Sequence, residues 1–190
     1  MIIDPAVRIN INKVVAKRFS TRAYNNCNDF AVRCAKTNNY QNMNKIVKDI
    51  TIGKLAEIYA HKILYPFYPM LTLPDFTIYP KGKKSFSADL SCTLNDITTD
   101  LSVKAQDINQ AEKHGESWTF AKHDKSLYIP NPNHFAVFVV VDIYNRICKL
   151  AAIVSVDKLN EQQLFGEMNV LWLRETKKCV YMRDLEDKYK

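Results

Sequence analysis

The run HFAVFVVVDI, at residues 134–143, most constrains the fold because it is apolar at nearly every position. Successive side chains of a strand point to opposite faces, so this run predicts a strand that is covered on both faces. The predicted order around it is a helix, three strands, a short helix, further strands and a helix. This order predicts an α/β or α+β fold, in which helices flank a mixed central β-sheet.

Hydrophobic periodicity and turn residues place the other elements. We expect residues 1–45 to form a basic, partly helical N-terminal extension to an α/β domain at 46–190, unless 1–190 is one domain. Helices are predicted at 43–64, 108–114 and 157–165. Strands are predicted at 75–79, 85–93, 98–106, 134–143, 146–156 and, near the end of the chain, in NVLWLR (169–174) and CVYMRDL (179–185).

The segments SFSADLSCT (85–93) and TTDLSVKAQ (98–106) both alternate polar and apolar residues, which is typical of paired strands. If Asn95 and Asp96 form a two-residue turn, the apolar faces coincide and Asp89 lies opposite Ser102. Lys104 and Asp100 are then diagonal neighbours of Asp89, at about 7–8 Å between Cα atoms. This polar face is either simply solvated or part of a site.

Glu57 breaks the pattern of the helix predicted at 43–64. On a helical wheel it lies inside the apolar arc, while Lys48, Lys54, His61 and Lys62 occupy the opposite side. Burial of an unpaired carboxylate is costly, so Glu57 needs a partner. It is either a salt-bridged glutamate or a carboxylate directed into a site.

In order along the chain, these features are Glu57 in GKLAEIYA, Asp89 in FSADLS, Lys104 and Gln106 in LSVKAQ, and the apolar strand FAVFVVVD. Over residues 50–143 the sequence resembles the PD-(D/E)XK nuclease superfamily, to which many restriction endonucleases belong. The resemblance implies a restriction-endonuclease-like core that cuts DNA with Mg²⁺, or with Mn²⁺ as a substitute. It also implies the catalytic set Asp89, Lys104, Glu57 and Gln106.

The sequence departs from the family pattern at Ser102, where an acid usually stands two residues before the lysine. Asp89 would be the first metal ligand, and Asp100 or Glu57 would replace the missing acid. Mg²⁺ keeps several waters, so one or two carboxylates suffice to bind it. The Pro74-Asp75 dipeptide is an alternative position for the first acid. The departure also leaves open a nuclease-fold DNA-binding protein that has lost cleavage.

The charge of the chain favours a polyanionic partner, because Lys and Arg outnumber Asp and Glu by 27 to 20. Double-stranded DNA is the expected partner, bound by a homodimer if both strands are cut. A basic RNA-binding or interaction module is a further alternative, and each basic cluster can also be a solubilising surface. The residues expected to bind nucleic acid are Lys81, Lys83, Lys84, Arg18, Arg22 and Lys122.

The chain has five cysteines, an odd number, and no CxxC pair, which argues against a disulfide framework or a zinc knuckle. We therefore expect reduced cysteines and a cytoplasmic, intracellular protein. The longest strongly apolar run is too short to span a bilayer, so no membrane association is expected. With four glycines, the chain also lacks a glycine-rich phosphate loop.

Overall fold

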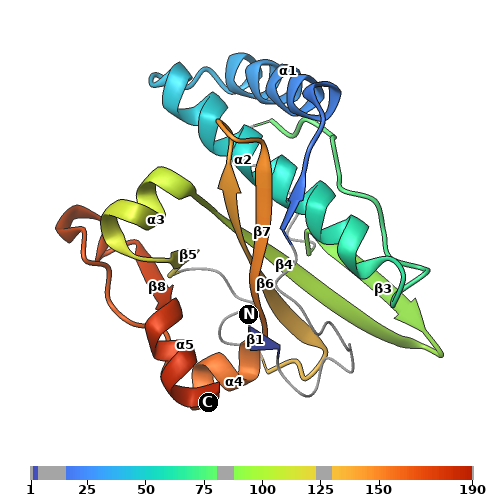
Figure 1. Ribbon diagram of the computed structural model, residues 1–190, viewed down its shortest axis with the longest axis vertical. Coiled ribbons are helices and arrows are strands. Elements are labelled where there is room, and N and C mark those ends of the chain that lie inside the picture. Colours follow the sequence, from blue (N-terminus) through green and yellow to red (C-terminus); the bar gives the residue numbers. More distant parts are fainter. Residues whose placement is uncertain (1, 4–15, 81–87, 123–129, 190) are drawn as a thin grey trace.

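The computed structural model describes residues 2–3, 16–80, 88–122 and 130–189. Its central mixed sheet has the strand order β1-β7-β6-β4-β3, and β2 also pairs with β7 (Figure 1). The predicted mixed sheet flanked by helices is therefore confirmed. The sheet strands are β1 (Ile2–Ile3), β2 (Ala16–Arg18), β3 (Leu90–Leu94), β4 (Ile97–Asp107), β6 (His134–Asp142) and β7 (Ile147–Ser155).

Strand β6 is the centre of the fold, as the apolar run predicts. All of its residues are buried except Asp142, and it pairs in parallel with β4 and antiparallel with β7. Val137 and Val139 pack into a core with α2 (Met43–Leu64), whereas Ala136 and Phe138 pack into a second core on the other face. Both faces are apolar because each is covered by a separate layer.

The two layers differ in composition. Helix α2 and α1 (Thr21–Thr37) cover one face of the sheet (Figure 1). The other face is covered by three shorter helices and a two-stranded ribbon. These elements are α3 (Ile108–His114), α4 (Val156–Glu161), α5 (Met182–Tyr189), β5 (Ser117–Ala121) and β8 (Lys177–Tyr181).

Helix α2 has the bounds that the sequence predicts. Its N-cap is Asn42, whose side-chain oxygen accepts a hydrogen bond from the backbone N–H of Lys45. Its last helical residue, Leu64, is followed by Tyr65 and Pro66, and proline cannot continue the i to i−4 hydrogen bonds. The helix therefore carries Glu57 across the sheet at a fixed position.

The strand predicted at 75–79 is absent from the structure, because local hydrogen bonds hold this segment as a loop. The Asp75 carboxylate accepts hydrogen bonds from the Thr77 backbone N–H at 2.8 Å and from the Tyr79 hydroxyl at 2.7 Å. Phe76 packs edge-on against Phe30 of α1, with 5.1 Å between ring centroids. An aspartate that binds its own following backbone favours a turn over a sheet edge.

The C-terminal predictions are partly wrong. Residues 169–174 contain a short 3₁₀-helix at Leu171–Leu173 instead of a strand, and the last predicted strand ends at Tyr181, where α5 follows. Trp118 and Phe120 of β5 are buried against Phe138, so they are not available for base stacking.

The N-terminal elements join the same sheet and layer. Both β1 and β2 pair with β7, and α1 packs against α2. Ser20 caps α1 through a hydrogen bond from the Ala23 backbone N–H to its hydroxyl oxygen. Arg18 and Arg22 therefore lie beside β7 and at the start of α1, and both are exposed.

Candidate functional site

The hairpin β3–β4 fixes the position of Asp89. Leu90 pairs with Leu101 and Leu94 pairs with Ile97, which confirms the predicted register. The two turn residues, Asn95 and Asp96, have φ angles of 50° and 61°, as a type I′ turn requires. Asp89 directly precedes β3, and β4 extends beyond this point without β3 as a pairing partner.

The carboxylate of Asp89 binds the edge of β4. Its Oδ2 atom accepts a hydrogen bond from the backbone N–H of Val103 at 2.8 Å. The side chain therefore takes the place of the next strand–strand hydrogen bond and is held in one orientation. Lys104 is the next residue along β4, so the acid and the lysine of the predicted site are neighbours in the hairpin.

Glu57 reaches the same region from α2. It is 8% exposed, and its Oε2 atom lies 2.6 Å from the Lys54 ammonium nitrogen. Burial raises the pKa of Glu57 to about 7; Lys54 lowers it, and the negative charges of Asp89 and Asp75 raise it further. The helix glutamate and the hairpin aspartate are thus electrostatic neighbours.

Lys54 is the residue of this region that sequence reasoning missed. The helical wheel places it on the polar side, yet its side chain is only 17% exposed and forms an ion pair with Glu57. Its spacing of three residues from Glu57 was the available signal, because residues i and i+3 are neighbours on a helix. The wheel assigned it to the wrong side because a long lysine side chain can bend toward an acid.

Lys104 and Ser102 point to the face of β4 opposite α2. The Lys104 ammonium lies 5.0 Å from the centroid of the Phe120 ring, and Phe120 belongs to the core on that face. The Ser102 hydroxyl is hydrogen-bonded to Nε2 of His134 at 2.9 Å. By strand alternation, Asp100 points to the same face as Ser102 and Lys104. Of the two acids considered as replacements at Ser102, only Glu57 therefore lies on the α2 side of the sheet.

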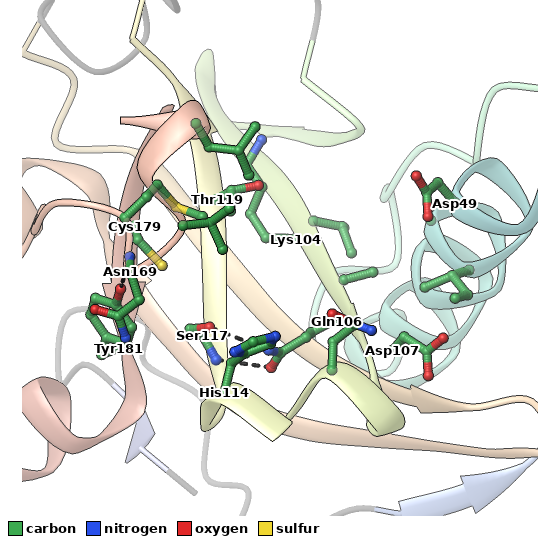
Figure 2. A pocket seen from close by; sticks show the side chains of 18 residues that line it. Asp49, Lys104, Gln106, Asp107, His114, Ser117, Thr119, Asn169, Cys179 and Tyr181 are labelled. Atoms are coloured by element: carbon green, nitrogen blue, oxygen red, sulfur yellow. Dashed lines mark hydrogen bonds between the residues drawn. The ribbon is translucent and has the colours of Figure 1, made fainter. Parts of the chain in front are cut away.

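Gln106 has a structural role. Its amide nitrogen donates to the Gly115 carbonyl at 3.0 Å and to the Ser117 hydroxyl at 3.2 Å, and its oxygen accepts from the Ser117 backbone N–H at 2.8 Å. Figure 2 shows the hydrogen bonds that join Gln106 and Ser117. The side chain therefore attaches the start of the β5–β8 ribbon to the sheet.

A cavity of about 510 Å³ runs from α2, across residues 103–107 of β4, to the β5–β8 ribbon. Figure 2 shows Lys104 and Gln106 at its centre, Asp49 and Asp107 on the α2 side, and Tyr181 on the other. Gly53 of α2 lines it about one helical turn before Glu57. Lys104 lines this cavity, together with Val103, whose backbone N–H binds Asp89, whereas Glu57 and Asp89 do not line it.

Carboxylates are the donors that a magnesium ion would require in this region. Mg²⁺ prefers oxygen ligands and retains water, so one or two carboxylates can bind it. Glu57 and Asp89 supply such a pair, and the desolvated carboxylate of Glu57 favours a cationic partner. Within the described ranges, no group of three or more His, Cys, Asp or Glu side chains is arranged to hold a metal ion.

No family model, no curated protein and no solved structure matches this chain.

The residues expected to bind nucleic acid lie in different parts of the molecule. Arg18 and Arg22 are exposed near the start of α1, and Lys122 is exposed after β5, in the opposite layer. Lys81, Lys83 and Lys84 lie outside the described residues. In the part of the chain that the structure describes, no helix is long and apolar enough to cross a membrane.

Proposed function

We propose that the protein is a Mg²⁺-dependent DNA endonuclease with a restriction-endonuclease-like core. The observation that carries the proposal is the proximity of a buried helix glutamate, Glu57, to an aspartate, Asp89, that is fixed at the edge of β4. The order helix, hairpin, helix and parallel central strand also agrees with the order that the resemblance implies.

In this proposal Glu57 and Asp89 bind the metal ion, with Mn²⁺ as a substitute. Bound Mg²⁺ would supply charge stabilisation on the phosphate and a water of lowered pKa. The Val103 N–H keeps Asp89 in place, and Lys104 approaches the scissile phosphate from the cavity. Of the two acids considered as replacements at Ser102, Glu57 is favoured over Asp100, because Glu57 interacts electrostatically with Asp89.

Double-stranded DNA is the proposed substrate, and the net charge of +7 supports a polyanionic partner. One such site cuts one strand, so we propose a homodimer for double-strand cleavage. The five cysteines are free, and four of them are buried, which agrees with a reducing cytoplasm.

Plasmid nicking tests the proposal. Supercoiled DNA is incubated with the protein in Mg²⁺, in Mn²⁺ and in EDTA, alongside the Glu57→Gln and Asp89→Asn variants. We expect nicked or linear product with wild-type protein and metal only. If the wild-type and both variants convert DNA equally, or if EDTA has no effect, the metal-dependent site is excluded.

A second candidate is a nuclease-fold protein that binds DNA without cutting it. The hydrogen bond between Ser102 and His134 favours it, because the position that usually carries the second acid is occupied by a neutral, internally bonded group. In this case the gel-shift affinity would be preserved in every acidic variant, and no product would form with any metal.

A further inference from the structure

The ammonium group of Lys54 is held on several sides although it belongs to a helix surface. It lies 2.6 Å from Glu57, and it also lies 5.6 Å from the ring centroids of both Phe30 and Phe76. The two rings come from α1 and from the loop after α2, and they contact each other edge-on. Three segments far apart in the sequence therefore surround one lysine.

The surroundings of Lys54 explain how the buried charge of Glu57 is tolerated. An unpaired buried carboxylate costs free energy, and the ammonium compensates this charge. Asp75 interacts electrostatically with both Glu57 and Lys54. Its negative charge raises the pKa of Glu57. The pKa of Asp75 itself is lowered, mainly by its hydrogen bonds to Thr77 and Tyr79 and to a smaller extent by the charge of Lys54. Glu57 thus already has a cation beside it, the ammonium of Lys54 on the same helix.

We propose that Lys54 occupies the cation position of the Glu57–Asp89 site in the metal-free protein, and that it must release Glu57 before a divalent cation can bind. This inference rests on the proposed function, since it concerns the same two acids. An ammonium and a divalent ion repel each other and compete for the same carboxylate oxygens. Cation–π interactions with the rings of Phe30 and Phe76 would still stabilise the Lys54 ammonium after it leaves Glu57.

The competition predicts that removing the Lys54 charge strengthens metal binding. Mg²⁺ affinity is measured by titration calorimetry at pH 8.5, which is above the Glu57 pKa of about 7, on full-length protein. Lys54→Met and Lys54→Gln should bind Mg²⁺ roughly tenfold more tightly than the wild type, a difference of one order of magnitude in Kd. Lys54→Arg keeps the charge and should not bind more tightly than the wild type.

Lys62→Met is the matched control. Lys62 lies on the same helix and is exposed, so this substitution makes the same change in net charge away from the acids. We expect its Mg²⁺ affinity to equal that of the wild type. Circular dichroism verifies that every variant is folded. If only one of Lys54→Met and Lys54→Gln is folded, the affinity of the folded variant is compared with that of the wild type.

Three results would overturn the inference: equal or weaker Mg²⁺ binding by the neutral Lys54 variants, an equal gain in Lys62→Met, or no Mg²⁺ binding by any of the proteins. Plasmid nicking separates this result from the proposed function. Wild-type cleavage with unchanged affinity in Lys54→Met would remove the inference and leave the nuclease. Tighter binding in Lys54→Met without any cleavage would leave the inference and remove the nuclease.

Discussion

The two faces of β4 carry polar side chains in different electrostatic states. On the α2 side, Glu57 of α2 is buried, and burial together with the negative charge of Asp89 raises its pKa to about 7. On the other side, Gln106 is neutral, and its amide is satisfied by hydrogen bonds to Gly115 and Ser117. A fully hydrogen-bonded amide connects two elements of the fold, whereas a buried carboxylate is stabilised in its charged form by a nearby cation.

The cavity connects these faces at the edge of β4. Lys104 belongs to the second face, yet the residue before it binds Asp89 through its backbone. The proposed site therefore depends on both sides of β4, with Glu57 on the α2 side and Lys104 on the other. The following substitutions test whether the two faces act together.

Asp89→Ala should have the largest effect. Loss of a metal ligand removes several kcal/mol of transition-state stabilisation, so cleavage should fall on the order of 1000-fold. Asp100→Ala is the matched control, since it removes an acid from the same hairpin on the second face, and we expect a loss below about fivefold. Initial rates of plasmid nicking measure both. Equal losses would place Asp100 in the site as well.

Glu57→Gln should change the pH dependence of stability. The pKa of Glu57 is raised in the folded protein above its ordinary value of 4.5, so its contribution to stability is complete below pH 4.5 and is lost as pH rises through 7. Wild-type protein should lose up to about 3 kcal/mol relative to the variant over this window. Urea denaturation of both proteins from pH 4 to pH 8 measures the difference. Parallel curves would show that Glu57 is solvated.

Lys104→Met tests the second face. Its ammonium should stabilise charge that develops on the phosphate, so cleavage should fall roughly 100-fold while DNA affinity and fold are retained. Nicking rates and gel-shift affinities are compared with those of Lys62→Met, which removes the charge of an exposed lysine on α2. A near wild-type rate in Lys104→Met would restrict the reaction to the α2 face.

Gln106→Ala should have the smallest effect on chemistry and a measurable effect on folding. It leaves the Ser117 N–H and the Gly115 carbonyl without this partner, which should cost about 1–3 kcal/mol of unfolding free energy. Urea denaturation measures this loss, and the Mg²⁺ affinity should stay unchanged. A loss of Mg²⁺ affinity at unchanged stability would instead assign Gln106 to the metal site, in addition to the catalytic set in which the resemblance places it.

Local sequence patterns predicted the elements that depend on short-range order. The apolar run at 134–143, the helix at 43–64 and the register set by Asn95 and Asp96 are all present in the structure. Each follows from periodicity, capping or turn chemistry within a few residues. The loop at 75–79 was missed because the hydrogen bonds of Asp75 and the contact of Phe76 with α1 compete with strand propensity.

The alternation of polar and apolar residues is enough to place Asp89, Ser102 and Lys104 in one hairpin, and the helical period is enough to place Glu57 on an apolar helix face. The partners of each side chain follow from the packing of the elements. This packing placed Lys54 between Glu57 and two aromatic rings, and it placed Lys104 over Phe120. A helical wheel or a strand alternation gives the direction of a side chain relative to its own helix or strand. The residues that this side chain contacts depend on how α1, α2 and the β5–β8 ribbon pack on the sheet.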